Sequence, residues 1–200
     1  MVNEFRFYHG TMSSMKTATL LMTNHSLRAK GHLVWLLKSA IDTRSGADVI
    51  ASRVGLCANA DAVIGPNDSP LFLLKNTAFS PRTQPDIILV DEAQFLTAQQ
   101  IAELREIVSF KEIPVFCYGL RTDASTKLFE GSKRLIELSD VLIELENHCD
   151  CGAKAIISAR VDSEGKVVMP NSQIDIGGNE KYKPMCYRCW RQGGGEPNDS

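Results

Sequence analysis

The chain alternates short apolar runs with longer segments that mix apolar and polar residues. The apolar runs predict buried strands at residues 5–8, 32–37, 63–64, 86–90, 114–119 and 141–145. Between them, apolar residues recur at helical spacing and predict helices over 17–30, 71–76, 98–110 and 131–138. Strands that alternate with helices in this way predict an α/β fold with a parallel sheet, which binds ligands at the carboxyl ends of its strands.

The pattern changes after residue 145. Apolar residues at 155–161 and 167–169 flank a turn at 163–165, and this arrangement predicts a β-hairpin. The last residues are glycines and polar residues, a composition that predicts disorder. We therefore predict a core over residues 1–146, a small β domain over 147–192 and a disordered tail over 193–200.

Composition and charge mainly exclude classes of function. The chain has 200 residues, enough for a sizeable core and a small appendage, and its net charge of −2 gives no overall attraction to nucleic acid. No segment has the pattern of a signal peptide, and no apolar run is long enough to span a bilayer. We expect a cytoplasmic protein with neither a membrane nor a nucleic acid as partner.

The stretch HGTMSSMKT, residues 9–17, closes the first predicted strand and opens the first predicted helix. It matches the phosphate-binding pattern G-x-x-x-x-G-K-[ST], except that Met15 replaces the second glycine. Such a loop surrounds phosphates with backbone N–H groups, and places Lys16 on phosphate oxygens and the Thr17 hydroxyl on Mg²⁺. If Met15 needs a positive φ, its side chain costs roughly 1–2 kcal/mol. The predicted site is made of Gly10, Thr11, Met12, Ser13, Ser14, Met15, Lys16 and Thr17.

Two acids, Asp91 and Glu92, directly follow the apolar strand at 86–90. Asp91 is placed to hold Mg²⁺ beside Thr17, and Glu92 to take a proton from an acceptor hydroxyl group. The alternative is an acidic pair that only caps the next helix. Because both this pair and the loop at 9–17 follow strands of a parallel sheet, we expect them at the same edge.

Three loop arginines, Arg44, Arg53 and Arg121, could each neutralise charge on a transferring phosphoryl group. Each of them, like Asp42, could equally be an ordinary surface residue.

Four of the six cysteines form two close pairs, Cys149-x-Cys151 and Cys186-x-x-Cys189. In a cytoplasmic chain such pairs favour a metal over disulfides, and four thiolates suit a structural, tetrahedral Zn²⁺. Free thiols are the alternative, and His148 is a competing ligand.

Several stretches together resemble the thymidine kinases of the type that includes the human cytosolic and many bacterial enzymes. They are HGTMSSMKT, DTR at 42–44, SRVGL at 52–56, ILVDEAQFL at 88–96, CYGLRTD at 117–123, IGGNEKY at 176–182 and the paired cysteines. The resemblance covers about residues 4–190. It implies a P-loop NTPase core with a small C-terminal zinc-binding β domain. It also implies transfer of the ATP γ-phosphate to the 5′-hydroxyl of thymidine, which gives dTMP for DNA precursor salvage.

The same resemblance implies roles for individual residues. It makes Glu92 the general base and adds Asp91 and Gln94 to the ATP and Mg²⁺ site. It implies that a lasso loop at about 174–182 folds over the base, and that the substrate contacts are Asp42, Arg44, Phe95, Leu120, Ile176, Gly177 and Tyr182. A homotetramer and feedback inhibition by thymidine triphosphate (dTTP) are further expectations from the family.

Three residues depart from the family pattern: Met15, Ala124 in place of a phenylalanine, and Asp175 in place of a small apolar residue. They keep open a divergent or inactive nucleotide-binding protein of the same fold, or a deoxynucleoside kinase with altered base preference. A zinc-ribbon nucleic-acid binder joined to an ATPase is a third alternative, but the C-terminal region lacks a dense basic and aromatic stripe.

Overall fold

A six-stranded sheet forms the centre of the computed structural model, which describes residues 2–76, 84–170, 172–173 and 181–196. The strand order is β5-β2-β6-β7-β1-β8, and every neighbouring pair is parallel. These strands are β1 (Phe5–His9), β2 (Val34–Ser39), β5 (Ala62–Ile64), β6 (Ile87–Asp91), β7 (Val115–Gly119) and β8 (Val141–Glu144). The predicted parallel α/β sheet is therefore confirmed.

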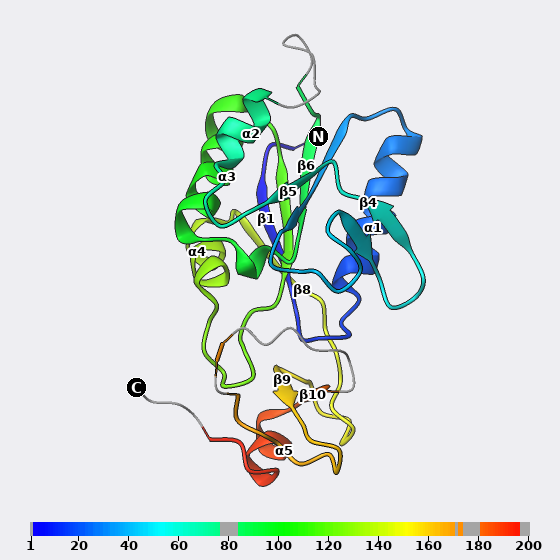
Figure 1. Ribbon diagram of the computed structural model, residues 1–200, viewed down its shortest axis with the longest axis vertical. Helices are drawn as coiled ribbons and strands as arrows, with labels where there is room; N and C mark the ends of the chain where they lie inside the picture. Colours follow the sequence, from blue (N-terminus) through cyan, green and yellow to red (C-terminus); the bar gives the residue numbers. More distant parts are fainter. Residues whose placement is uncertain (1, 77–83, 171, 174–180, 197–200) are drawn as a thin grey trace.

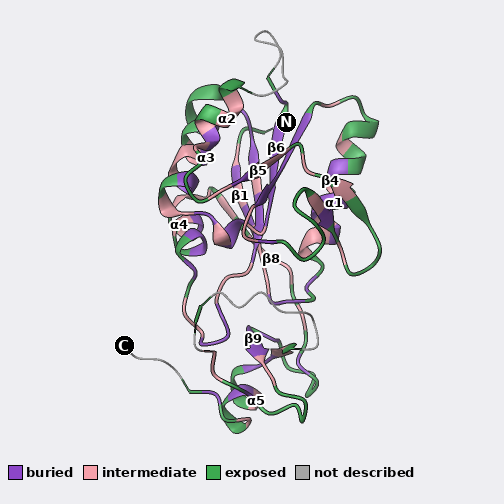
Figure 2. Cartoon of the chain, in the orientation of Figure 1, coloured by how far each residue is buried: buried purple, intermediate pink, exposed green. Residues whose placement is uncertain are grey.

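Helices cover both faces of this sheet (Figure 1). One face carries α1 (Lys16–Ala29), and the other carries α2 (Pro70–Asn76), α3 (Ala98–Lys111) and α4 (Glu130–Leu138). Apolar side chains fill both layers, so that the strands are buried between the helices (Figure 2). None of the helices within the described ranges is long and apolar enough to cross a membrane.

The predicted start of α3 is confirmed by a reciprocal cap. The Thr97 hydroxyl accepts a hydrogen bond from the Gln100 N–H at 3.2 Å, and the Gln100 side chain accepts one from the Thr97 N–H at 3.0 Å. These bonds satisfy donors that the first turn of a helix otherwise leaves open. The helix therefore begins soon after the acids that end β6.

A β-hairpin lies beside α1, where the sequence predicted only a loop around Arg53 (Figure 1). Its strands are β3 (Val49–Ala51) and β4 (Cys57–Asn59), which pair antiparallel. Each strand has three residues, too few for an alternating pattern to stand out in the sequence. The turn between them carries Arg53.

The C-terminal region, residues 147–196 where described, lies at the end of the sheet where β1 and β6 finish (Figure 1). It contains β9 (Ile157–Arg160), β10 (Tyr182–Met185) and the helix α5 (Tyr187–Gln192). Its own apolar cluster includes the fully buried Trp190. A second small core thus supports this region.

Two details of this region differ from the prediction. The expected hairpin between 155–161 and 167–169 is reduced to one bridge, between Val161 and Val167, and β9 instead pairs antiparallel with the distant β10. Order also extends past residue 192, because the Gly193 and Gly195 N–H groups donate to the carbonyls of Cys189 and Trp190. Residues 197–200 of the expected disordered tail lie outside the described residues.

Candidate active site

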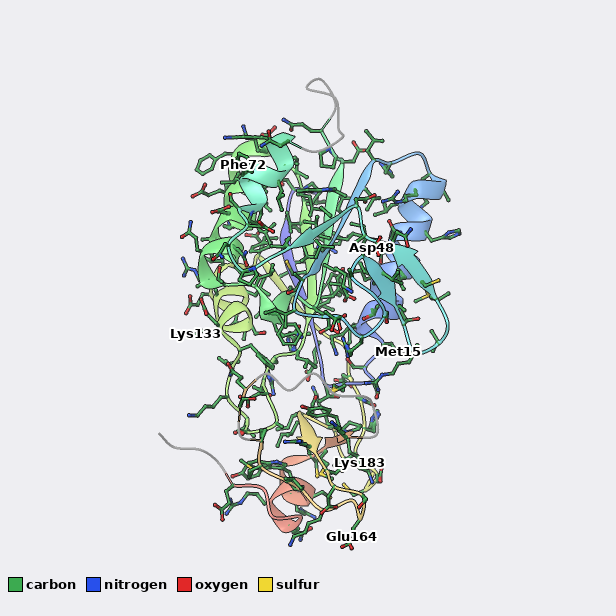
Figure 3. The ribbon with its side chains drawn as sticks, in the orientation of Figure 1. Met15, Asp48, Phe72, Lys133, Glu164 and Lys183 are labelled. Carbon is green, nitrogen blue, oxygen red and sulfur yellow. The ribbon has the colours of Figure 1, made fainter. Side chains whose placement is uncertain are left out.

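The loop between β1 and α1 is tightly curled. Ser13 and Met15 have positive φ angles of 66° and 64°, so the condition under which the Met15 side chain costs conformational energy is met. At Gly10, a Cβ atom would lie 2.4 Å from both the Leu145 carbonyl oxygen and the Ser14 hydroxyl oxygen. Only glycine therefore fits at this end of the loop, whereas Met15 keeps its side chain half exposed at the start of α1 (Figure 3).

The Lys16 ammonium lies in the hollow of this loop. Its Nζ donates to the carbonyl oxygens of Gly10 at 3.2 Å and Thr11 at 2.6 Å, and to the Ser14 hydroxyl at 3.3 Å. Burial lowers the pKa of Lys16 to about 8, although the charges of Glu92 and Asp91 act to raise it. A phosphate group nearby would favour the charged form further.

The two acids that end β6 lie beside the loop, as predicted, and their side chains have different partners. The Thr17 hydroxyl lies 3.3 Å from both carboxylate oxygens of Asp91. Glu92 has the left-handed backbone angles φ 50° and ψ 40°, a conformation that costs of order 1–3 kcal/mol for a residue other than glycine. Its carboxylate contacts Arg44 and Gln94.

A chain of hydrogen bonds fixes the Glu92 carboxylate on both oxygens. Arg44 Nη2 donates to Oε1, and Gln94 Nε2 donates to Oε2 at 2.5 Å. Arg44 Nε also donates to Asp42 Oδ1 at 2.6 Å, while Gln94 Oε1 accepts the Leu120 N–H at 3.0 Å. Burial would raise the pKa of Asp42, but the hydrogen bonds and charge of Arg44 lower it below its usual value.

Burial and the neighbouring charge of Glu92 raise the pKa of Asp91 from 3.8 to about 7. At pH 8 the group is ionised in both the folded and the unfolded chain, so the folded state bears the full cost of burying the charge. As the pH falls through 7 the folded chain takes up a proton and the cost shrinks, and it disappears below about pH 4, where the group is protonated in the unfolded chain as well.

Asp91→Asn should therefore raise the free energy of unfolding by a few kcal/mol at pH 8 and by clearly less at pH 5. Urea unfolding at the two pH values measures the difference. Asp48→Asn, an exposed change at a residue labelled in Figure 3, should stay within about 0.5 kcal/mol of the wild type. An equal effect of Asp91→Asn at both pH values would contradict the expectation.

One cavity of about 750 Å³ is lined by the loop, the acids and an apolar wall. This wall includes Phe95, Leu120, Ala124 and Phe129. The predicted site residues that line it are Met12, Ser13, Ser14, Met15, Lys16, Thr17, Asp42, Arg44, Asp91, Glu92, Gln94, Phe95, Leu120 and Tyr182. Gly10 and Thr11 border a small neighbouring cavity instead, together with Arg121. Ile176, Gly177 and Asp175 lie outside the described residues.

The cavity is also lined by Phe129, which the sequence did not indicate, and by Ala124 and Arg53, both of which the sequence singled out. Phe129 is buried in its apolar wall and packs edge to face on Phe95, with ring centroids 5.8 Å apart and planes at 82°. Ala124 is buried in the same wall, so an aromatic ring borders this space even though residue 124 is small. Arg53 reaches the cavity from the β3–β4 turn and donates to the Ser13 hydroxyl.

The four paired cysteines come together in the C-terminal region. Their sulfur atoms all lie within 4.8 Å of one another. Four thiolates at 2.3 Å from one Zn²⁺ would place the sulfurs about 3.8 Å apart, so the cluster suits that ion. Although burial acts to raise it, the N–H groups of Cys151 and Cys186 lower the pKa of Cys149 to about 7, which favours the thiolate that binds metals. In the described part of the chain this group contains only cysteines, so His148 is not one of its members.

Met15→Gly should relieve backbone strain without removing a buried side chain. We expect stability to rise by up to about 1 kcal/mol, since the gain of roughly 1–2 kcal/mol is partly offset by the greater entropy of glycine in the unfolded chain. ATP affinity should be equal or higher. Thermal unfolding and calorimetric titration with ATP check both statements. A collapse of ATP affinity would instead identify Met15 as an adapted contact.

Known relatives of this protein match nearly the whole chain. A thymidine kinase from Ruegeria pomeroyi is 37% identical over 191 residues, which cover 96% of this chain and 95% of that protein. One from Shewanella oneidensis is 38% identical over 186 residues, or 93% of this chain and 95% of that protein. Among solved structures, the Pif1 helicase from Candida albicans has a TM-score of 0.44 at 16% identity, over 72% of this chain and 36% of that one, too weak a likeness to support an argument.

The family model described as thymidine kinase matches residues 3–190. That match spans the sheet, the cavity and the four cysteines. This chain therefore belongs to the thymidine kinase family.

Proposed function

We propose that this chain transfers the γ-phosphate of ATP to the 5′-hydroxyl of thymidine and so supplies dTMP to DNA precursor salvage. The observation that carries the proposal is the single cavity that Lys16, Asp91 and Glu92 share with an apolar wall. Phosphate-binding groups and a carboxylate on one side, and aromatic and aliphatic side chains on the other, suit an ATP phosphate and a nucleoside base together.

The loop and Lys16 hold the phosphates of ATP in this proposal. Thr17 and Asp91 would hold Mg²⁺, which fits their oxygen donors, and the ion would neutralise charge on the phosphate oxygens. Glu92 accepts the proton of the 5′-hydroxyl as its oxygen attacks the γ-phosphorus. The new bond joins that oxygen to phosphorus, the bond from phosphorus to the β–γ bridging oxygen breaks, and ADP leaves.

In this proposal Arg44 and Gln94 act on the general base, Glu92, rather than on the phosphate. They hold both oxygens of Glu92, so that the carboxylate presents one direction to an incoming hydroxyl group. Asp42 in turn orients Arg44.

The apolar wall receives the thymine ring. Phe95, Leu120 and Tyr182 line it, and we propose that Ile176 and Gly177 add contacts from the lasso loop. Zn²⁺ in the cysteine cluster would have a structural role, since four protein ligands would leave no open position on the ion. Inhibition by dTTP and assembly as a homotetramer are the remaining parts of the proposal, and only the membership of the family supports them.

Two deoxy analogues of thymidine test the position of transfer. We expect 3′-deoxythymidine to accept phosphate from γ-labelled ATP, because it keeps the 5′-hydroxyl. We expect 5′-deoxythymidine to accept none, yet to compete with thymidine for the cavity. Phosphate transfer to 5′-deoxythymidine would contradict the proposed reaction.

A further inference from the structure

Met12, in the middle of the phosphate loop, has both of its backbone polar groups bonded to the C-terminal region. Its N–H donates to Ser158 Oγ at 2.8 Å, and its carbonyl oxygen accepts from Asn147 Nδ2 at 3.0 Å. Asn147 Nδ2 also lies 3.4 Å from the Thr11 hydroxyl. The partners are 146 and 135 residues away from Met12 in the chain, so only the folded structure brings them to the loop.

The Met12–Ser158 hydrogen bond is buried, although both residues also line the cavity, and the Asn147 contacts are partly buried. Met12 is 9% exposed and Ser158 is 3% exposed. A buried N–H that loses its partner cannot exchange it freely for water, so it destabilises the conformation that buries it. The loop conformation in which Met12 faces the C-terminal region therefore depends on the Ser158 hydroxyl.

The loop needs such support because of its backbone. Ser13 and Met15, which follow Met12 closely, both have positive φ angles. Residues other than glycine keep such angles only where the surrounding structure holds them in place. The bonds at Met12 fix the chain just before the strained part of the loop.

Both partners are tied to the four-cysteine cluster. Ser158 lies on β9 between Ile157 and Ala159, which pack in the same apolar cluster as Cys149 and Cys186. Asn147 precedes Cys149 by two residues, and its carbonyl oxygen accepts the Ala155 N–H at 2.8 Å. The region that would bind zinc thus sets the positions of both side chains.

We propose that Ser158 and Asn147 are positioning residues for the phosphate loop, and that through them the zinc-binding region sets the affinity for ATP. This inference rests on the proposed function, since it takes the loop to be the ATP site. A loop that adopts several conformations binds ATP only in the competent one. Its apparent affinity for ATP is therefore reduced in proportion to the fraction of molecules in that conformation. The affinity for thymidine, which would bind at the apolar wall, should not change with this fraction.

The test compares Ser158→Ala with Ser163→Ala in the full chain. Ser163 is an exposed serine of the same region, next to Glu164, which Figure 3 places at the end far from the sheet. We expect Ser158→Ala to weaken ATP binding about tenfold by calorimetric titration, the effect of leaving one buried donor unpaired. Thymidine affinity, zinc content and melting temperature should stay close to those of the Ser163→Ala control.

Asn147→Ala provides a second variant at the other backbone polar group of Met12, its carbonyl oxygen, and should also weaken ATP binding selectively. Unchanged ATP affinity in both variants would overturn the inference while leaving the proposed function intact. Loss of zinc, or an equal loss of thymidine affinity, in both variants would overturn it too, because the two residues would then act on the fold in general. A wild-type chain that binds no ATP would overturn the proposed function together with this inference.

Discussion

Glu92→Gln should lower the rate of phosphate transfer to thymidine by about a thousandfold, because a positioned general base contributes 10²–10⁴-fold to such reactions. Glutamine has nearly the same shape and keeps an oxygen that can accept from Arg44, but it cannot take the proton of the 5′-hydroxyl. ATP should bind to the variant with an affinity within about twofold of the wild type, because the phosphate loop and Asp91 are unchanged.

The matched control is Glu106→Gln, the same chemical change at an exposed residue of α3. Single-turnover transfer of labelled γ-phosphate measures the rate in each protein, and calorimetric titration measures ATP affinity. Turnover by Glu92→Gln that stays within about tenfold of the Glu106→Gln control would remove Glu92 as the base.

Cys186→Ser should remove the zinc and loosen the C-terminal region. We expect close to one zinc per chain in the wild type and almost none in the variant, because a structural site of this class needs all four ligands. Cys186 Sγ also accepts the Cys189 N–H at 3.4 Å as the cap of α5, a role that a serine hydroxyl can take over. The effect of the change is therefore on the metal.

Metal analysis and limited proteolysis measure the two parts of this prediction. Proteases should cut the variant within the C-terminal region and leave the sheet protected, because the two parts have separate apolar clusters. Cys57→Ser is the control, since Cys57 is exposed on β4 and outside the cysteine cluster. A full zinc content in Cys186→Ser, or no zinc in wild-type protein purified without chelators, would contradict the account.

Those parts of the fold that depend on local pattern could be predicted. The apolar runs that became β2, β6 and β7 are continuous, and the cap at Thr97 is a local signal. The pairing of β9 with β10 could not be predicted, because the strands are separated by a long connection and the nearer segment around Val167 offers a competing partner. The hairpin of β3 and β4 is too short to produce a pattern.

The candidate site divides in the same way. The loop at 10–17 and the acids Asp91 and Glu92 could be found because the residues of each motif are adjacent in the sequence and directly follow a predicted strand. Phe129 could not, since nothing in its neighbourhood along the chain indicates that it packs on Phe95. The hydrogen bond from the Met12 N–H to Ser158 could not be predicted either, because an isolated serine in a strand has no sequence pattern that indicates its partner.

The most direct test of the account is transfer of the γ-phosphate from ATP to thymidine, with deoxyuridine, deoxycytidine and deoxyguanosine measured in parallel. We predict turnover with thymidine at the highest kcat/KM of the four, because Phe95 and Phe129 keep aromatic surface beside Ala124. A preference for another nucleoside would contradict the assigned base. No transfer to any nucleoside, from a chain that still binds Mg-ATP, would contradict the proposed kinase activity itself.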